Sequence, residues 1–347
     1  MLKLFDVDWI RNEYNGKAEV IIVSILFAPI FFTGLLGNLW LIVTILRKQI
    51  PVTSSTIYTL CLALGDLCTI LGLIPMLLST YVTETLPNDH SSSNTSSPSS
   101  TSFITPTLAS SMCILSDTLR DISVSVSSLT LIAVSLDRYL AVLSAVAWMQ
   151  KQVDRKHRNL ALATIYLIWL ISIMLALPTS LSSRLTRTQL DSGSTLLICT
   201  PGFTFLPKPG PQILTALKTI IFFLIPILIT SYCYTIVARK LVYNVKNKLT
   251  YRKTSKDRAL RKATFTIRLA FLLVGLFALS FLPHHLVNLY FYFKPISSNE
   301  ALFWQTARIT SFMCIFINSV LNPIIICSTS CHLKKLIKSK FSFLRDI

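Results

Sequence analysis

Seven long apolar stretches follow one another along the chain, separated by polar segments. Crossing the hydrocarbon core of a bilayer takes about 20 residues of α-helix, at about 1.5 Å per residue. Val20–Leu46 and Thr219–Ala238 contain no charged residue at all. This pattern predicts an all-α membrane protein and disfavours the alternative, the buried helices of a large soluble protein. The expected spans are residues 20–46, 55–81, 112–142, 159–178, 212–238, 263–293 and 301–327.

Composition and charge support this interpretation. Hydrophobic residues make up 52% of the chain and charged residues 14%, with a mean hydropathy of +0.61. The net charge of +18 would suit nucleic-acid binding if it were evenly spread, but 21 of the 33 lysines and arginines lie in four segments that alternate with the apolar stretches. These segments are Arg47–Lys48, Lys151–Arg158, Arg239–Lys262 and Lys334–Arg345.

All four basic segments would lie on one side of the membrane, and the positive-inside bias makes that side the cytoplasm. We therefore expect a multi-pass plasma-membrane protein with its N-terminus outside and its C-terminus in the cytoplasm. The expected acidic partner is the anionic lipid of the inner leaflet rather than nucleic acid. The third stretch (112–142) is weak by hydropathy, because it contains many serines as well as Arg120 and Asp121. If this stretch did not cross the membrane, however, two of the basic segments would lie on opposite sides of the membrane.

The spans divide the chain into three parts. Residues 1–19 form an extracellular N-terminal tail, 20–327 the seven-transmembrane domain, and 328–347 a cytoplasmic amphipathic helix and tail. Within the domain, the Ser/Thr-rich segment 89–111 is expected to be a disordered external loop, and it carries a glycosylation sequon at Asn94. After the seventh helix, apolar residues recur at helical spacing with lysines between them, which is typical of a short helix lying on the membrane surface.

Asp66 lies in the middle of the second apolar stretch. An ionisable residue inside a membrane helix costs roughly 2.5 kcal/mol or more unless it is paired or hydrated. One interpretation is a polar switch that binds an allosteric sodium ion or a proton, with Ser127, Asn318 and Asn322 expected at a similar depth. The other is a hydrogen-bonded packing residue. No other cofactor and no further metal site is expected.

Asp137-Arg138-Tyr139 ends the third stretch just before a basic loop. One interpretation is a two-state lock, in which Arg138 pairs with Asp137 at rest and is released on activation; the other is a solvated helix end. The 25 residues from Cys113 to Arg138 span about 37 Å of helix, so the cysteine is expected at the outer face. Pro226, Pro283 and Pro323 each remove a helical hydrogen bond, which makes them candidate hinges or simple kinks.

Residues 20–341 resemble the rhodopsin-like (class A) G-protein-coupled receptors, because the chain carries a landmark of that family in each of the seven spans. The landmarks, in order, are Gly37-Asn38, Leu62 with Asp66, Cys113 with Asp137-Arg138-Tyr139, Trp169 with Pro178, Pro226 with Tyr234, Phe277 with Phe281-Leu282-Pro283, and Asn318-Ser319 with Asn322-Pro323.

The resemblance implies a receptor that activates heterotrimeric G proteins at a cytoplasmic cleft containing Arg138, Tyr234 and the basic third loop. It also implies a disulfide between Cys113 and Cys199, both of which are expected outside the cell, where thiols oxidise. No catalytic set of residues points to an enzyme.

Three positions depart from the family pattern: Ile326 replaces a tyrosine, Phe281 a tryptophan and Ala145 a proline. The alternative function is therefore an atypical, decoy or constitutively active seven-helix receptor with little ligand-driven signalling.

The outer cavity gives the clue to the ligand. Arg120 stands where amine receptors carry an aspartate, and residues 301–327 contain no lysine for retinal. Arg120, Lys218 and Arg308 are expected to converge on a ligand carboxylate. Alternatively, Arg120 pairs with Asp121 or a neighbour while the other two cations reach water. His284, His285 and Asn288 are expected to line the cavity or to bond between helices.

Two stretches resemble the galanin and allatostatin-like neuropeptide receptors, and this similarity favours a peptide ligand. They are Leu282-Pro283-His284-His285 and the run from Arg308-Ile309-Thr310 to Asn322-Pro323-Ile324-Ile325.

Overall fold

The computed structural model describes residues 17–81, 106–143, 150–189, 195–201, 207, 209–247, 253–294, 301–329 and 333. The glycosylation site at Asn94, most of the predicted N-terminal tail and the C-terminal tail after residue 333 lie outside this part of the chain. Seven helical spans within the described part are long and apolar enough to cross a membrane. The predicted all-α fold with seven transmembrane helices is therefore confirmed.

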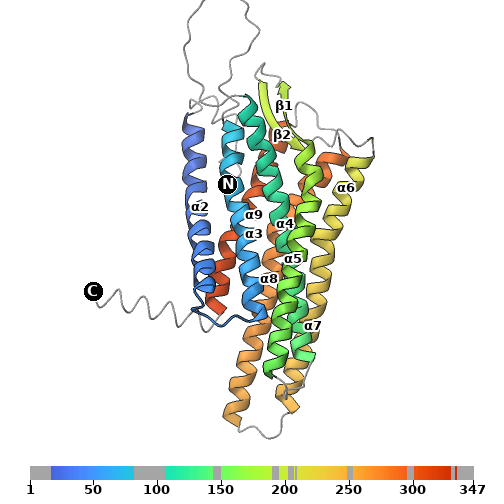
Figure 1. The fold of residues 1–347 in the computed structure, drawn as a ribbon. Coiled ribbons are helices and arrows are strands. Elements are labelled where there is room, and N and C mark those ends of the chain that lie inside the picture. Colours follow the sequence, from blue (N-terminus) through green and yellow to red (C-terminus); the bar gives the residue numbers. More distant parts are fainter. Residues whose placement is uncertain are drawn as a thin grey trace, which may run out of the picture.

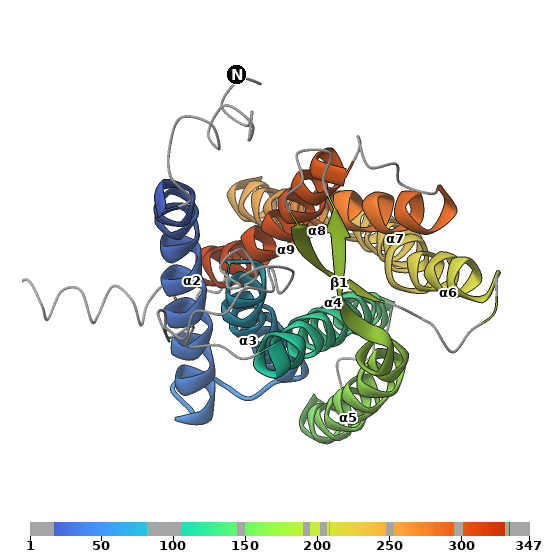
Figure 2. The same ribbon diagram turned by 90° about the horizontal axis from the view of Figure 1, so that it is seen from above.

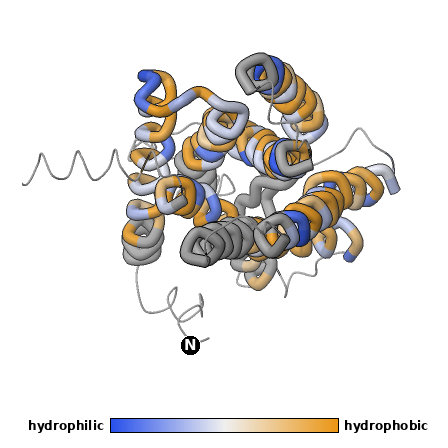
Figure 3. The backbone as a smooth tube through the Cα atoms, turned by 90° about the horizontal axis from the view of Figure 1, so that it is seen from below, coloured by the Kyte–Doolittle hydropathy of each residue, from blue (hydrophilic) through white to orange (hydrophobic). Residues whose placement is uncertain are grey.

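The helices follow the predicted spans closely (Figure 1). Hydrophobic residues predominate along them (Figure 3). Helix five is built from three consecutive pieces, α6, η3 and α7. The bounds are α2 Lys17–Leu46, α3 Ser54–Tyr81, α4 Pro106–Leu143, α5 Gln150–Ser182, α6 Gly210–Thr219, η3 Ile220–Leu224, α7 Ile225–Asn247, α8 Lys253–Phe293 and α9 Ala301–Thr329.

Several helices extend beyond their apolar stretches. Helix α5 begins nine residues before the predicted start at 159, and α8 begins ten before 263. Hydropathy marks the part of a helix that suits lipid, whereas lysine and arginine continue a helix readily in water. Helix α4 begins at Pro106, because proline suits the first helical turn. The prediction of a disordered loop over 89–111 is therefore wrong for residues 106–111.

Helix α4 occupies the centre of the bundle. It packs against α3, α5 and α7, while α2 closes the ring by contacting both α3 and α9. The view along the bundle in Figure 2 shows this order. Residues of α4 therefore contact several helices at once, which explains how so many serines are accommodated: Ser123, Ser125, Ser127, Ser128 and Ser135 are all buried.

An antiparallel hairpin covers one end of the bundle. Strand β1 (Ser183–Gln189) continues directly from α5 and pairs with β2 (Thr195–Pro201), with Leu185 opposite Cys199. Both strands contact α4. We call this end of the bundle the hairpin end, and the end that carries Arg138 the opposite end. The sequence pattern predicts only helices, so the hairpin is an addition that the structure reveals.

Helix five contains a π-helical turn, η3, just before Pro226. Proline has no N–H, so the carbonyl four residues earlier, on Phe222, loses its helical partner. The Ser128 hydroxyl of α4 donates to that carbonyl at 2.7 Å. The side chain of a neighbouring helix thus satisfies the group that the proline releases, and the irregular turn is fixed in place.

Close approach between helices depends on two glycines. A Cβ atom on Gly37 would lie 3.0 Å from Pro323 Cγ, and one on Gly65 would lie 2.9 Å from Val126 Cγ1. Next to Gly37, the Asn38 side-chain amide donates to the carbonyl of Ser319 at 3.1 Å and so ties α2 to α9. The landmarks in the first and seventh spans are therefore packing partners.

The amphipathic helix predicted after the seventh span lies mostly outside the described residues. Leu333, its one described residue, is helical and buried. It packs with Leu41, Ile42 and Ile45 of α2. The apolar side of this segment therefore meets the bundle at Leu333.

Candidate functional site

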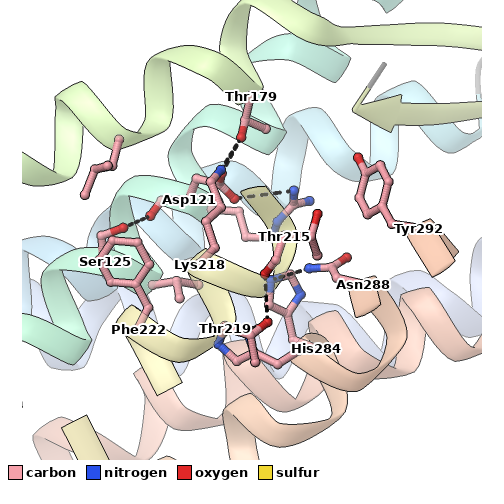
Figure 4. Close-up of a pocket in the computed structure, with 14 residues that line it drawn as sticks. Asp121, Ser125, Thr179, Thr215, Lys218, Thr219, Phe222, His284, Asn288 and Tyr292 are labelled. Carbon is pink, nitrogen blue, oxygen red and sulfur yellow. Dashed lines mark hydrogen bonds and ion pairs between the residues drawn. The ribbon is translucent and has the colours of Figure 1, made fainter. Parts of the chain in front are cut away.

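A cavity opens among α4, α5, α6 and α8 near the hairpin end (Figure 4). Its wall combines charged and hydroxyl-bearing side chains with aromatic rings. This composition makes the cavity the candidate binding pocket. It is lined by Arg120, Asp121, Val124, Ser125, Leu175, Thr179, Thr215, Lys218, Thr219, Phe222, His284, His285, Asn288 and Tyr292.

Asp121 joins three helices on one side of the pocket. Its Oδ2 accepts from Lys218 Nζ of α6 at 2.6 Å and from the Thr179 hydroxyl of α5 at 2.6 Å. Lys218 Nζ also donates to Thr179 Oγ1 at 2.6 Å. Figure 4 shows these three side chains pointing toward one another. The lysine and the aspartate are each more than four-fifths buried, so the pair is largely withdrawn from water.

Arg120 is paired on the neighbouring face of α4. Its Nη1 lies 2.5 Å from Asp117 Oδ1, and its Nη2 lies 3.7 Å from Asp121 Oδ1. Asp117 also accepts from the Ser183 hydroxyl at the start of β1 at 3.0 Å. The guanidinium lies over the Phe312 ring, 4.6 Å from its centroid. Arg120 is therefore held by carboxylates and an aromatic face together.

The predicted cluster of ligand-binding cations is only partly present. Arg120 and Lys218 do converge on one pocket, but each is already neutralised, Arg120 mainly by Asp117 and Lys218 by Asp121. The alternative in which Arg120 pairs with a neighbouring carboxylate is the arrangement observed, and Lys218 does not simply reach toward water. The side chain of Arg308 lies outside the described side chains.

Sequence reasoning missed Asp117 and Thr179. Asp117 and Arg120 stand three positions apart, so a helical α4 places them on the same face. That spacing was the available signal. Thr179 offered none, since its role depends on how α5 packs against α4.

The two histidines are buried and hydrogen-bonded. His284 Nε2 lies 3.0 Å from Asn288 Nδ2 on the same helix, and His285 Nδ1 lies 3.4 Å from Thr219 Oγ1 on α6. His284, His285 and Asn288 all line the pocket, as expected. His285 Nε2 has no hydrogen-bond partner in the described part of the chain. It remains available to a ligand group.

The pocket wall continues into an aromatic cluster toward the middle of the bundle. Phe281 is 1% exposed and lies 4.7 Å from Phe277, ring centroid to ring centroid. Phe277 in turn lies 6.5 Å from Phe223 of η3. The cluster also contains Phe222, which lines the pocket. A change in the pocket can therefore reach α8 near Pro283 through packed rings.

Asp66 is completely buried among polar groups of α9. Asn322 Nδ2 donates to Asp66 Oδ2 at 2.9 Å, whereas Asp66 Oδ1 has no hydrogen-bond partner among the described residues. Ser127 Oγ, close to Gly65, is also buried, and no hydrogen bond to it is formed within the part of the chain that the structure describes. Buried oxygens without donors suit a small cation. The predicted polar site therefore fits sodium, which Asp66 and Ser127 would hold, with Asn318 and Asn322 nearby in sequence on α9.

We predict that sodium stabilises the protein through Asp66. If sodium is present at about ten times its dissociation constant, it adds about 1.4 kcal/mol, or roughly 3–6 °C in Tm. Thermal unfolding of purified protein in NaCl and in KCl measures this difference. The Asp66→Asn variant should lose the difference and Cys68→Ser should keep it; a wild-type protein with equal Tm in both salts contradicts the prediction.

Arg138 has a different partner from the one expected at the opposite end. Its Nη2 donates to Ser55 Oγ of α3 at 2.5 Å. The predicted resting ion pair with Asp137 is not formed in this conformation, and Tyr139 is half-buried. Tyr234 is buried and packs with Val274, while Ile326 packs with the cluster around Leu41. Tyr234 and Ile326 thus belong to separate apolar clusters.

Cys113 is buried and forms a disulfide. The described free cysteines are Cys61, Cys68, Cys233, Cys314 and Cys327. Strand β2, whose backbone includes Cys199, contacts α4. The side chain of Cys199 lies outside the described side chains, so its pairing with Cys113 stays a prediction.

Comparison with known proteins gives consistent matches. The family described as 7 transmembrane receptor (rhodopsin family) matches residues 37–326. The Neuropeptide CCHamide-1 receptor of Drosophila melanogaster is 31% identical over 90% of this chain and 58% of its own length. Galanin receptor 2a of Danio rerio is 29% identical over 94% of this chain and 80% of its own length. Galanin receptor type 2 of Homo sapiens is 29% identical over 91% of this chain and 72% of its own length.

Proposed function

Because the chain belongs to the rhodopsin family of seven-transmembrane receptors, we propose that it is a receptor for an extracellular peptide that activates heterotrimeric G proteins. The ligand enters the pocket from the hairpin end, which faces outside. The opposite end, with Arg138 and the basic segments, faces the cytoplasm. Anionic lipids of the inner leaflet contact those basic segments.

The observation that carries the peptide proposal is the pocket beneath the hairpin. Its lining offers aromatic rings beside hydrogen-bonding groups, which suits the end of a peptide. The relatives named above are receptors for neuropeptides and galanin, and they support the same ligand class.

The proposal that ligand binding activates a G protein rests on the residues that connect the pocket with the opposite end of the bundle. Helix α8 contributes His284, His285 and Asn288 to the pocket and Phe277 and Phe281 to the aromatic cluster. Helices α4 and α7 carry Arg138 and Tyr234 at the opposite end. A ligand that repositions α8 about Pro283 would therefore change the opening between these helices.

Activation by a peptide panel tests the proposal. Cells expressing the receptor are exposed to a library of neuropeptides while sensors for the main G-protein classes are recorded. A peptide that activates at least one sensor is expected. Silence of every sensor in the wild type and in Ile326→Tyr, with the receptor at the cell surface, would instead favour the decoy alternative.

The role of Arg120 is tested with the active peptide. We expect Arg120→Ala to lower its potency about tenfold or more, because a charged hydrogen-bond donor of the wall is lost. The single variant also removes the cation that neutralises Asp117, so Asp117→Asn/Arg120→Ala is the matched control that removes both charges. Potency that is restored in the double variant would show that Arg120 only neutralises Asp117 and does not contact the ligand.

A further inference from the structure

At the opposite end of the bundle, Arg138 is bound by a serine of the adjacent helix, and no described carboxylate pairs with it. The bond from Arg138 Nη2 to Ser55 Oγ is 2.5 Å long. Within the described part of the chain Arg138 has no ion pair. Helix α8 offers little competition, because Asp257 is the only acidic residue in its sequence. The Ser55 hydroxyl is thus the group that fixes the position of the guanidinium.

Ser55 is placed by contacts that do not involve Arg138. In the first turn of α3, Thr53 Oγ1 accepts from the Thr56 N–H at 3.3 Å, and Thr56 Oγ1 donates to the Pro51 carbonyl at 2.9 Å. Thr53 therefore caps the helix, and the Ser55 hydroxyl is not needed for that purpose.

The next turn of α3 anchors Ser55 against α4. Ile57 and Tyr58 are buried in one cluster with Ala133, which lies just over one turn before Arg138. This packing holds the start of α3 at a fixed distance from the end of α4. The serine hydroxyl is consequently presented to the arginine by a rigid support.

We propose that Ser55 is a positioning residue that holds Arg138 against α3 and restrains the receptor from activating G proteins on its own. The proposal rests on the function proposed above. When Arg138 is bound to Ser55, its guanidinium is held by α3. Activation requires the bond to break. Arg138 itself is exposed, so the restraint is modest and sets basal activity rather than an absolute block.

Spontaneous nucleotide exchange tests this assignment. The full chain is reconstituted in lipid nanodiscs with a panel of G proteins and no ligand. We expect Ser55→Ala to raise the basal rate about two- to fivefold, because losing one hydrogen bond to a charged, exposed group shifts a two-state equilibrium by about that factor. Ser55→Thr keeps the hydroxyl and should restore the wild-type rate.

Ser54→Ala is the matched control. Ser54 lies in the same turn and is half-buried like Ser55, yet within the described residues its hydroxyl makes no hydrogen bond. The control should leave the rate unchanged. A Ser55→Ala rate at or below that of the wild type, or an equal rise in Ser54→Ala, overturns the proposal.

A second measurement separates this proposal from the proposed function. If no variant activates any G protein, the proposed coupling fails. The conformational role of Ser55 is then measured as the distance between spin labels at Arg158 on α5 and Leu272 on α8, which are both exposed positions. Ser55→Ala is expected to add a population at longer label distance. A distance distribution identical to that of the wild type overturns the role of Ser55 whatever the coupling result.

Discussion

Replacing Asp121 with alanine is expected to lower the Tm of the purified receptor by about 5–10 °C. Asp121 neutralises Lys218 and accepts from Thr179 in a largely buried place. Removing one partner of a fully buried ion pair costs about 3–5 kcal/mol. Because this pair keeps some exposure, we expect about 2–3 kcal/mol, which corresponds to that fall in Tm. Thermal unfolding in detergent measures it without a ligand.

Two variants isolate the stranded charge as the cause. Asp121→Ala/Lys218→Met removes both charges and should recover most of the loss, since a buried pair is often replaceable by apolar groups. Ser125→Ala, one turn along α4, removes only a hydroxyl bonded to its own helix and should change Tm by little. If Asp121→Ala melts within about 1 °C of the wild type, the network does not hold α4, α5 and α6 together.

Replacing Cys113 with serine is expected to cost about 2–4 kcal/mol of stability and to reduce the amount of receptor at the cell surface. Cys113 is disulfide-bonded, and losing a native disulfide typically has an effect of this size. The predicted partner is Cys199 in β2, which would tie the hairpin to α4. Thermal unfolding and surface labelling measure the two effects.

The pairing itself is tested by comparing single and double variants. Cys199→Ser should match Cys113→Ser, and the double variant should be no worse than either, since both changes remove the same bond. Cys68→Ser, which replaces a free cysteine of α3, is the control for the substitution alone. A fully stable Cys199→Ser beside a destabilised Cys113→Ser would show that the partner is another cysteine.

The membrane fold could be predicted because lipid selects for a simple property. A run of apolar residues long enough to cross a bilayer is visible without any knowledge of packing, and all seven runs became helices. The weakest of them, around Arg120 and Asp121, was recovered from the charge asymmetry of the loops. The helix ends differed because helices continue past the hydrocarbon region whenever no residue stops them.

The pocket was predictable only in part, because pairing depends on contacts between helices. Helical spacing placed Arg120, Lys218, His284 and Asn288 near one cavity, and all four line it. The same spacing did not reveal that Thr179 would bridge Asp121 and Lys218. For Arg138 the sequence left a pair with Asp137 and a solvated helix end as alternatives, whereas Ser55, on a helix more than 80 positions earlier, is the observed partner.

The π-turn at Ile220–Leu224 separates two parts of helix five whose side chains are rotated relative to each other about the helix axis. A wider turn accommodates about one extra residue, which rotates everything before it by about 100° relative to everything after it. Because of this rotation, Lys218 and Thr219 point toward the pocket. Tyr234 keeps the direction set by the regular helix that follows Pro226. Substitutions that change the face of helix five at the pocket can therefore be accepted independently of those that change its face at the opposite end of the bundle.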